Sequence, residues 1–132
     1  MDILMNDARS ILRGHTGDLA DKIHEILYAD DILIVDEDGE LAQLYMDIIA
    51  KQGSYYGLSF NWSKLQYISI GCDPGLVQDN GDAIERVHNL KYHGGILASD
   101  GQIACELSTK ICIAMGEFSN LQRIWSHCNI TI

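Results

Sequence analysis

Two adjacent carboxylates, Asp30 and Asp31, are the residues of this sequence best suited to chemistry. They end the run Tyr28-Ala29-Asp30-Asp31, which has apolar segments on both sides. Neighbouring carboxylates repel one another unless a cation lies close to both, and Mg²⁺ prefers one or two carboxylates together with the phosphates of a substrate. In phosphoryl transfer, two such ions about 3.5–4 Å apart bind the attacking and the leaving oxygens. The pair predicts a divalent-metal site, with a solvated acidic turn as the alternative interpretation.

The flanking segments predict that the two aspartates lie at the tip of a β-hairpin. Residues 23–28 and 32–35 are apolar and rich in branched side chains, which favours short antiparallel strands joined by a tight acidic turn. The acidic residues that follow favour a helix N-terminus, because they complement the helix dipole. Apolar residues at helical spacing over 41–52 predict that helix, which Gly53 or Gly57 would end.

The rest of the chain predicts one more short helix, a small sheet and a long final helix. Residues 3–12 have helical spacing, which Gly14 to Gly17 interrupts. A strand is expected over 65–70, and a hairpin over 76–87 around Asn80-Gly81, a pair typical of type I′ turns. The long helix would open at Ser99 or Asp100. Its apolar stripe is Ile103, Leu107, Ile111, Ala114, Phe118, Leu121 and Trp125.

Composition limits the class of protein. The 132 residues are 47% apolar and 21% charged, as in one globular domain. Nineteen acidic and nine basic residues give a net charge of −10, the wrong sign for holding nucleic acid by overall charge, so phosphate contacts would depend on local groups or metal ions. No apolar run approaches a membrane span and no signal peptide is evident, which predicts a soluble, intracellular protein, cytoplasmic or nuclear.

Four cysteines, Cys72, Cys105, Cys112 and Cys128, have neither C-x-x-C nor zinc-finger spacing. Because a metal knuckle and a disulfide framework both lack support, we expect small buried thiols.

Several motifs follow one another in a characteristic order. After the Tyr-Ala-Asp-Asp turn come Gly57-Leu58-Ser59-Phe60-Asn61-Trp62-Ser63-Lys64, then Lys91-Tyr92-His93-Gly94-Gly95, and then Asp100-Gly101 before the long helix. This set covers nearly the whole chain and resembles the second half of a reverse transcriptase of non-LTR (LINE-type) retrotransposons. In that family the acidic turn is motif C of the palm, Gly-Leu-x-x-Asn-x-x-Lys is motif D, and Tyr-Leu-Gly lies at the primer grip.

The resemblance implies a fold and a domain organisation. The fold would be α+β, a partial polymerase palm with a small antiparallel sheet and packed helices. The palm segment would cover residues 1–96. Residues 97–132 would be the start of the thumb, a long helix.

The resemblance also implies roles for the residues around the acidic turn. Asp30 resembles the motif C metal ligand, and Asp31 its partner carboxylate near the second Mg²⁺. Tyr28 and Ala29 would shape the turn beneath the primer end. Lys64 resembles the motif D lysine near the phosphates of the incoming nucleotide, where an ammonium group offsets charge or donates a proton to the leaving pyrophosphate. The alternative for Lys64 is an ordinary exposed lysine.

The third matching segment implies contact with nucleic acid. Tyr92 and Gly94 resemble the primer-grip turn, where glycine lets a strand approach the backbone closely. His93 stands where the family has leucine, which departs from the pattern. The partners implied for the complete enzyme are an RNA template, a DNA primer and a deoxynucleotide, with Mg²⁺ as cofactor.

The departures from the family concern what would precede the acidic turn. A family polymerase takes a third carboxylate from motif A, and that strand, the fingers and motif B would lie upstream of Tyr28. Only 27 residues precede it, and residues 1–12 resemble the helix after motif B. We therefore expect a partial palm that binds Mg²⁺ weakly, does not polymerise DNA in isolation, and self-associates through exposed apolar edges.

Two alternatives remain. Residues 31–40 and the helix after them also resemble the start of a response-regulator receiver domain, a phosphorylation switch with an acidic Mg²⁺ pocket. A receiver carries its phospho-acceptor aspartate four positions before a proline, but Ile70 holds that position before Pro74. It also alternates strands and helices. The other alternative is a non-enzymatic remnant of a retroelement.

Overall fold

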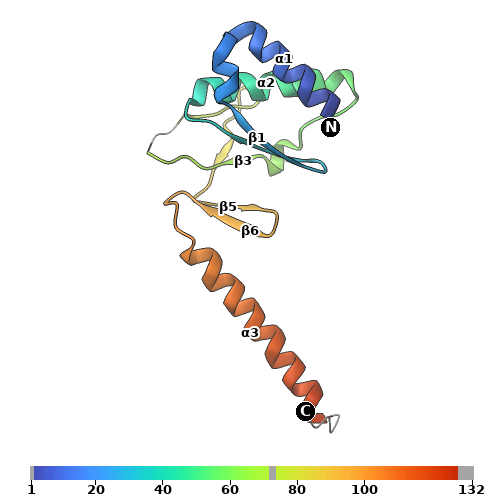
Figure 1. Cartoon of the computed structure of the whole chain (residues 1–132), viewed down its shortest axis with the longest axis vertical. Coiled ribbons are helices and arrows are strands. Elements are labelled where there is room, and N and C mark those ends of the chain that lie inside the picture. Colours follow the sequence, from blue (N-terminus) through green and yellow to red (C-terminus); the bar gives the residue numbers. More distant parts are fainter. Residues whose placement is uncertain (1, 72–73, 128–132) are drawn as a thin grey trace. The chain divides into compact units, whose positions relative to one another are not determined.

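The computed structural model describes residues 2–71 and 74–127, and its fold is α+β (Figure 1), as predicted. The elements are α1 (Asp2–Thr16), the 3₁₀ helix η1 (Gly17–Lys22), β1 (His24–Tyr28), β2 (Asp31–Val35), α2 (Gly39–Tyr55), the 3₁₀ helix η2 (Trp62–Lys64), β3 (Gln66–Tyr67), β4 (Glu85–Arg86), β5 (Asn89–Tyr92), β6 (Gly95–Ala98) and α3 (Ala104–His127). The chain divides into two compact units, the first ending at Glu85 and the second beginning at Arg86. The boundary expected after residue 96, between palm and thumb, stays a prediction.

The core of the first unit lies between α1, α2 and one face of the β1–β2 hairpin (Figure 1). Both helices are amphipathic, and the residues that they bury include Leu4, Met5, Ala8 and Leu12 from α1 and Leu41, Tyr45, Ile48 and Ile49 from α2. Strand alternation turns Leu27, Ile32 and Ile34 of the hairpin toward this cluster. The small side chain of Ala8, fully buried, leaves room for the helices to pack closely.

Both ends of α2 have clear local causes. The Asp38 carboxylate accepts from the backbone N–H of Glu40 at 2.9 Å and of Leu41 at 3.4 Å, which caps the N-terminus. At the other end, the N–H groups of Tyr56 and Leu58 both donate to the Gly53 carbonyl at 2.9 Å. Gly57, at φ +72°, makes the left-handed turn that ends the helix, whereas Gly53 lies inside it. The chain therefore reverses and passes back along α2.

The predicted acidic hairpin is present. β1 and β2 are antiparallel, and their last pair, Tyr28 with Asp31, closes a tight turn made by Ala29 and Asp30. Asp31 thus opens β2 instead of lying in the turn itself. The first residue of the turn, Ala29, has φ +52°, a left-handed conformation that glycine usually takes in such hairpins.

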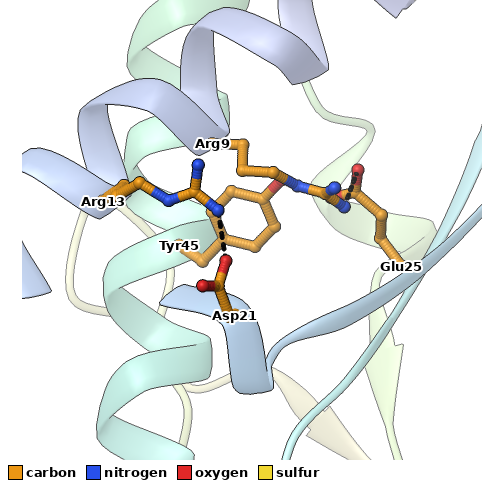
Figure 2. A network of polar contacts seen from close by, with 5 residues as sticks. All are labelled: Arg9, Arg13, Asp21, Glu25 and Tyr45. Carbon is orange, nitrogen blue, oxygen red and sulfur yellow. Dashed lines mark hydrogen bonds and ion pairs between the residues drawn. The ribbon is translucent and has the colours of Figure 1, made fainter. Parts of the chain in front are cut away.

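A polar network fastens β1 to both helices (Figure 2). Glu25, whose side chain is only 10% exposed, forms an ion pair with Arg9 of α1 at 2.6 Å and accepts a hydrogen bond from the hydroxyl of Tyr45 of α2. Arg13 of α1 pairs with Asp21 of η1. Burial raises the pKa of Tyr45 well above its usual value. The hydrogen bond to Glu25 and the negative charge of Glu25 raise this pKa further, whereas Arg9 lowers it.

This raised pKa predicts a loss of stability in alkali. Below pH 10 the Tyr45 phenol is protonated in both the folded and the unfolded chain, so its contribution is complete. Above pH 10 the unfolded chain releases this proton while the folded chain retains it, so the free energy of unfolding falls by up to about 1.4 kcal/mol per pH unit from this group. Urea unfolding at several pH values between about 9 and 11.5 measures that slope. The Tyr45→Phe variant should show a flatter slope, and equal slopes would contradict the assignment.

The strands after η2 are shorter than predicted. The strand expected over 65–70 is reduced to β3, two residues that pair with β4. The expected hairpin over 76–87 has one bridge, Val77 with Ala83. Its turn is not type I′, because Gly81 (φ +87°) is left-handed and Asn80 is not. The Gly81 N–H donates to the Gln78 carbonyl at 3.0 Å, as in a three-residue loop whose glycine forms a bulge.

The second unit contains the β5–β6 hairpin and α3. The hairpin turns at His93 (φ +52°) and Gly94 (φ +72°), the pair of left-handed residues that a type I′ turn requires. α3 begins at Ala104, later than predicted, because the Asp100 carboxylate accepts from the Gln102 N–H at 2.9 Å and Gly101 is left-handed.

The prediction of buried thiols is wrong for Cys105 and Cys112, which are free and exposed on α3. The reason is that their helix is exposed along nearly its whole described length. Cys72 and Cys128 lie outside the described residues.

Candidate metal and nucleotide site

A pocket of about 400 Å³ brings together the three residues to which the sequence assigned chemistry, Asp30, Asp31 and Lys64. The two aspartates reach it from the hairpin tip, and Lys64 from the end of η2. Its other lining residues come from α1, β2, α2 and the segment after α2: Leu4, Ile32, Ile49, Ala50, Gly53, Leu58, Ser59, Phe60, Asn61 and Leu65. Segments far apart in the sequence thus form one concave surface that combines apolar side chains with a few polar ones, as ligand pockets commonly do.

Lys64 is held by a well-bonded turn. Its backbone N–H donates to the Asn61 carbonyl at 2.9 Å, and the hydroxyl of Ser63 donates to the side-chain carbonyl of Asn61 at 2.7 Å. The rings of Phe60 and Trp62 pack edge to face, with centroids 5.3 Å apart. These contacts fix the 3₁₀ helix η2, so the lysine lies on a defined backbone at the pocket wall.

The charges of the pocket suit a bound metal–phosphate group. Asp30 and Asp31 are exposed, adjacent and both anionic, and Lys64 is the one basic residue among those that line the pocket. A divalent cation bound by the carboxylates and a phosphate placed between that cation and the ammonium group would satisfy both signs of charge.

The metal ligands that this part of the chain offers are two carboxylates. No group of three or more His, Cys, Asp or Glu side chains suited to a metal ion is found within residues 2–71 and 74–127. Asp30 and Asp31 have carboxylate oxygens, the ligands that Mg²⁺ prefers, and the remaining positions around an ion would go to water, substrate phosphates or a further carboxylate.

Tyr28 and Ala29 lie where the sequence analysis placed them, in and beside the turn. Tyr28 points to the exposed face of the hairpin, together with Ile26. Ala29 is strained, because a left-handed conformation costs a non-glycine residue about 1–2 kcal/mol. Strain of this kind is frequent where the backbone must hold functional side chains in one geometry.

Tyr92 and Gly94 belong to the second unit and are not among the residues that line the pocket. Gly94 forms the turn of the β5–β6 hairpin, and Tyr92 pairs with Gly95 at its end. The Tyr92 ring lies edge to face with the His93 ring, with centroids 5.0 Å apart. The segment is thus a hairpin tip.

Sequence reasoning missed two features of the first unit. Leu4 and Ile49, expected only as core residues of helices, also line the acidic pocket. A second pocket of about 220 Å³, lined by Arg9, Ala20, Asp21, Ile23, His24 and Glu25, was not expected either. The residue that could have indicated this second pocket is Glu25, because strand alternation places this charged side chain on the inward face of the hairpin beside Leu27.

Within residues 2–71 and 74–127, no helix is long and apolar enough to cross a membrane. No protein-family model, no curated protein and no solved structure matches the chain.

Proposed function

We propose that this chain is the C-terminal part of the palm of a LINE-type reverse transcriptase, with the start of the thumb, and that Asp30 and Asp31 bind the Mg²⁺ ions of nucleotide addition. One observation carries the proposal: the acidic hairpin tip and Lys64, 33 positions after Asp31 in the sequence, line one pocket. If the matches to the two motifs were accidental, nothing would require their residues to line the same pocket.

Three of the residues that line the pocket have chemical roles in this proposal. When bound, Mg²⁺ would supply the positive charge that activates the attacking primer hydroxyl and stabilises the leaving oxygen. Asp30 is the ligand of this Mg²⁺, and Asp31 is the second carboxylate of the site. Lys64 holds the phosphates of the incoming deoxynucleotide and can give a proton to the departing pyrophosphate. The strained Ala29 turn keeps the two aspartates at the hairpin tip, where primer and nucleotide would meet.

The strand pairing favours this proposal over a receiver domain. The β1–β2 and β5–β6 pairs are antiparallel hairpins, whereas a receiver needs a parallel sheet built from alternating strands and helices. Asp30 and Asp31 also lie at a hairpin turn instead of at the end of a central strand. A non-enzymatic remnant of a retroelement would have the same fold as a functional palm. A measurement of polymerase activity distinguishes the two.

Asp30 and Asp31 supply two carboxylates, whereas the polymerase reaction uses three. The proposed metal site therefore lacks one carboxylate ligand. The third would come from another segment or another polypeptide. We therefore expect no primer extension from this chain alone with either Mg²⁺ or Mn²⁺.

A chimera tests the proposal directly. Residues 1–132 replace the corresponding segment of an active LINE-type reverse transcriptase, and extension of a DNA primer on an RNA template is measured. Template-dependent extension by the chimera, with none by the isolated chain, is the expected result. A chimera that is folded but inactive would contradict the proposal and favour the remnant, while synthesis by the isolated chain would contradict the incomplete site.

A further inference from the structure

Helix α3 carries an apolar stripe that the described residues of its own unit leave exposed. All side chains from Leu107 to Gln122 are exposed, and the large apolar ones keep about half of their surface in water, for example Phe118 at 58% and Leu121 at 45%. The helix has 24 residues and is about 36 Å long. A single helix of this length is marginally stable in water unless its apolar face is packed against a partner.

The spacing of the stripe specifies the kind of partner. Its members are Leu107, Ile111, Ala114, Phe118, Leu121 and Trp125, which alternate in steps of four and three. This is the heptad spacing of helices that pair along their length. Phe118 and Trp125, one heptad apart, pack edge to face with ring centroids 6.0 Å apart, so the aromatic end of the stripe already has a defined shape. The stripe is thus suited to another helix with the same repeat.

Charge complementarity favours a second copy of α3 as that helix. Lys110 and Glu117 border the stripe at equivalent heptad positions. When two copies run antiparallel with Ile111 opposite Ala114, Phe118 meets Leu107 and Lys110 of each copy lies beside Glu117 of the other. A parallel pair would instead place Met115 and Gln122 beside these charges. Lys110 already binds Glu106 of its own helix at 2.6 Å, and its flexible stem allows it to contact both carboxylates.

We propose that the protein forms a two-fold symmetric homodimer through antiparallel pairing of α3. Two-fold symmetry makes each contact occur twice, so both Lys110–Glu117 pairs form together. The dimer is independent of the proposed polymerase function, because α3 contributes no residue to the acidic pocket.

Sedimentation of the full chain tests the dimer, with a reducing agent present because Cys105 and Cys112 are exposed thiols. We expect a concentration-dependent monomer–dimer equilibrium, which Ile111→Asn weakens by about tenfold or more. The matched control is Ile113→Asn, the same substitution off the stripe at a side chain 60% exposed, which should change dissociation by less than about twofold. A monomer at every concentration, or equal effects of the two substitutions, would overturn the proposal.

Charge exchange tests the antiparallel arrangement. Lys110→Glu and Glu117→Lys each place like charges together twice, so each variant alone should dimerise more weakly. An equimolar mixture of the two variants, or the double variant, restores opposite charges and should restore dimerisation. Circular dichroism checks that each variant keeps its helix. If the single variants dimerise as wild type does, or the double variant is weaker than both, the antiparallel pairing is wrong.

Discussion

Replacing Asp30 by Asn should abolish nucleotide addition by the chimeric enzyme while leaving its fold intact. Asn has nearly the same size as Asp but no charge, so it removes a metal ligand without opening a cavity. Metal stabilisation of the reacting oxygens contributes several kcal/mol, so the rate of single-nucleotide incorporation should fall by about 1,000-fold or more. Because Asp30 is exposed, the free energy of unfolding should change by no more than about 0.5 kcal/mol.

The matched control for this prediction is Asp79→Asn. Asp79 is also an exposed aspartate within a turn, but it does not line the pocket, so the same loss of charge there should leave the incorporation rate nearly unchanged. Extension at the wild-type rate by the Asp30→Asn chimera would remove Asp30 from the site. Equal losses from both variants would point to overall charge instead of metal ligation.

Replacing Tyr45 by Ala should be among the most destabilising single substitutions in the first unit. The ring is fully buried between the helices and the hairpin, and its hydroxyl is a hydrogen-bond donor to Glu25 (Figure 2). Removing a large buried side chain leaves a cavity and costs about 3–5 kcal/mol. Here it also takes a partner from the largely buried carboxylate of Glu25. Urea or thermal unfolding measures the change.

Two variants separate the contributions at this position. Tyr45→Phe keeps the ring and removes only the hydrogen bond to a charged group, so we expect a loss of about 1.5–3 kcal/mol. Tyr55→Ala makes the Tyr-to-Ala change at the end of the same helix, where the side chain is 73% exposed, and should stay within about 0.5 kcal/mol of wild type. A small effect of Tyr45→Ala would mean that Tyr45 does not hold the hairpin against the helices.

The elements that the sequence predicted correctly are those with strong local signals. Helical spacing located α1 and α2, and the branched runs on either side of Ala29-Asp30 located the hairpin. The short strands over 65–87 were less predictable, because β3 has only two residues and its pairing with β4 depends on distant segments. Asn80-Gly81 marked a turn but not its type, since that is decided by how many residues the loop contains.

The pocket residues, too, were predictable only in part. Asp30, Asp31 and Lys64 stand out in the sequence, and all three line this pocket. What the sequence did not reveal is that Leu4 and Ile49 also line the pocket, because core positions and pocket-lining positions of a helix have the same periodicity. The exposed cysteines of α3 were mispredicted for a different reason. Cysteine is commonly buried, but Cys105 and Cys112 lie off the apolar stripe, on a helix that is exposed along nearly its whole described length.

Binding of Mn²⁺ to the isolated chain, followed by nuclear magnetic resonance, tests most directly whether the two aspartates form a metal site. A bound Mn²⁺ ion broadens the backbone amide signals of the residues around it. We expect the signals of Asp30, Asp31 and residues 58–64 to weaken first, at lower Mn²⁺ concentrations when a deoxynucleotide is present, and this preference to disappear in Asp30→Asn. Broadening that begins equally at the acidic turn around Asp79 and Asp82 would contradict the metal site.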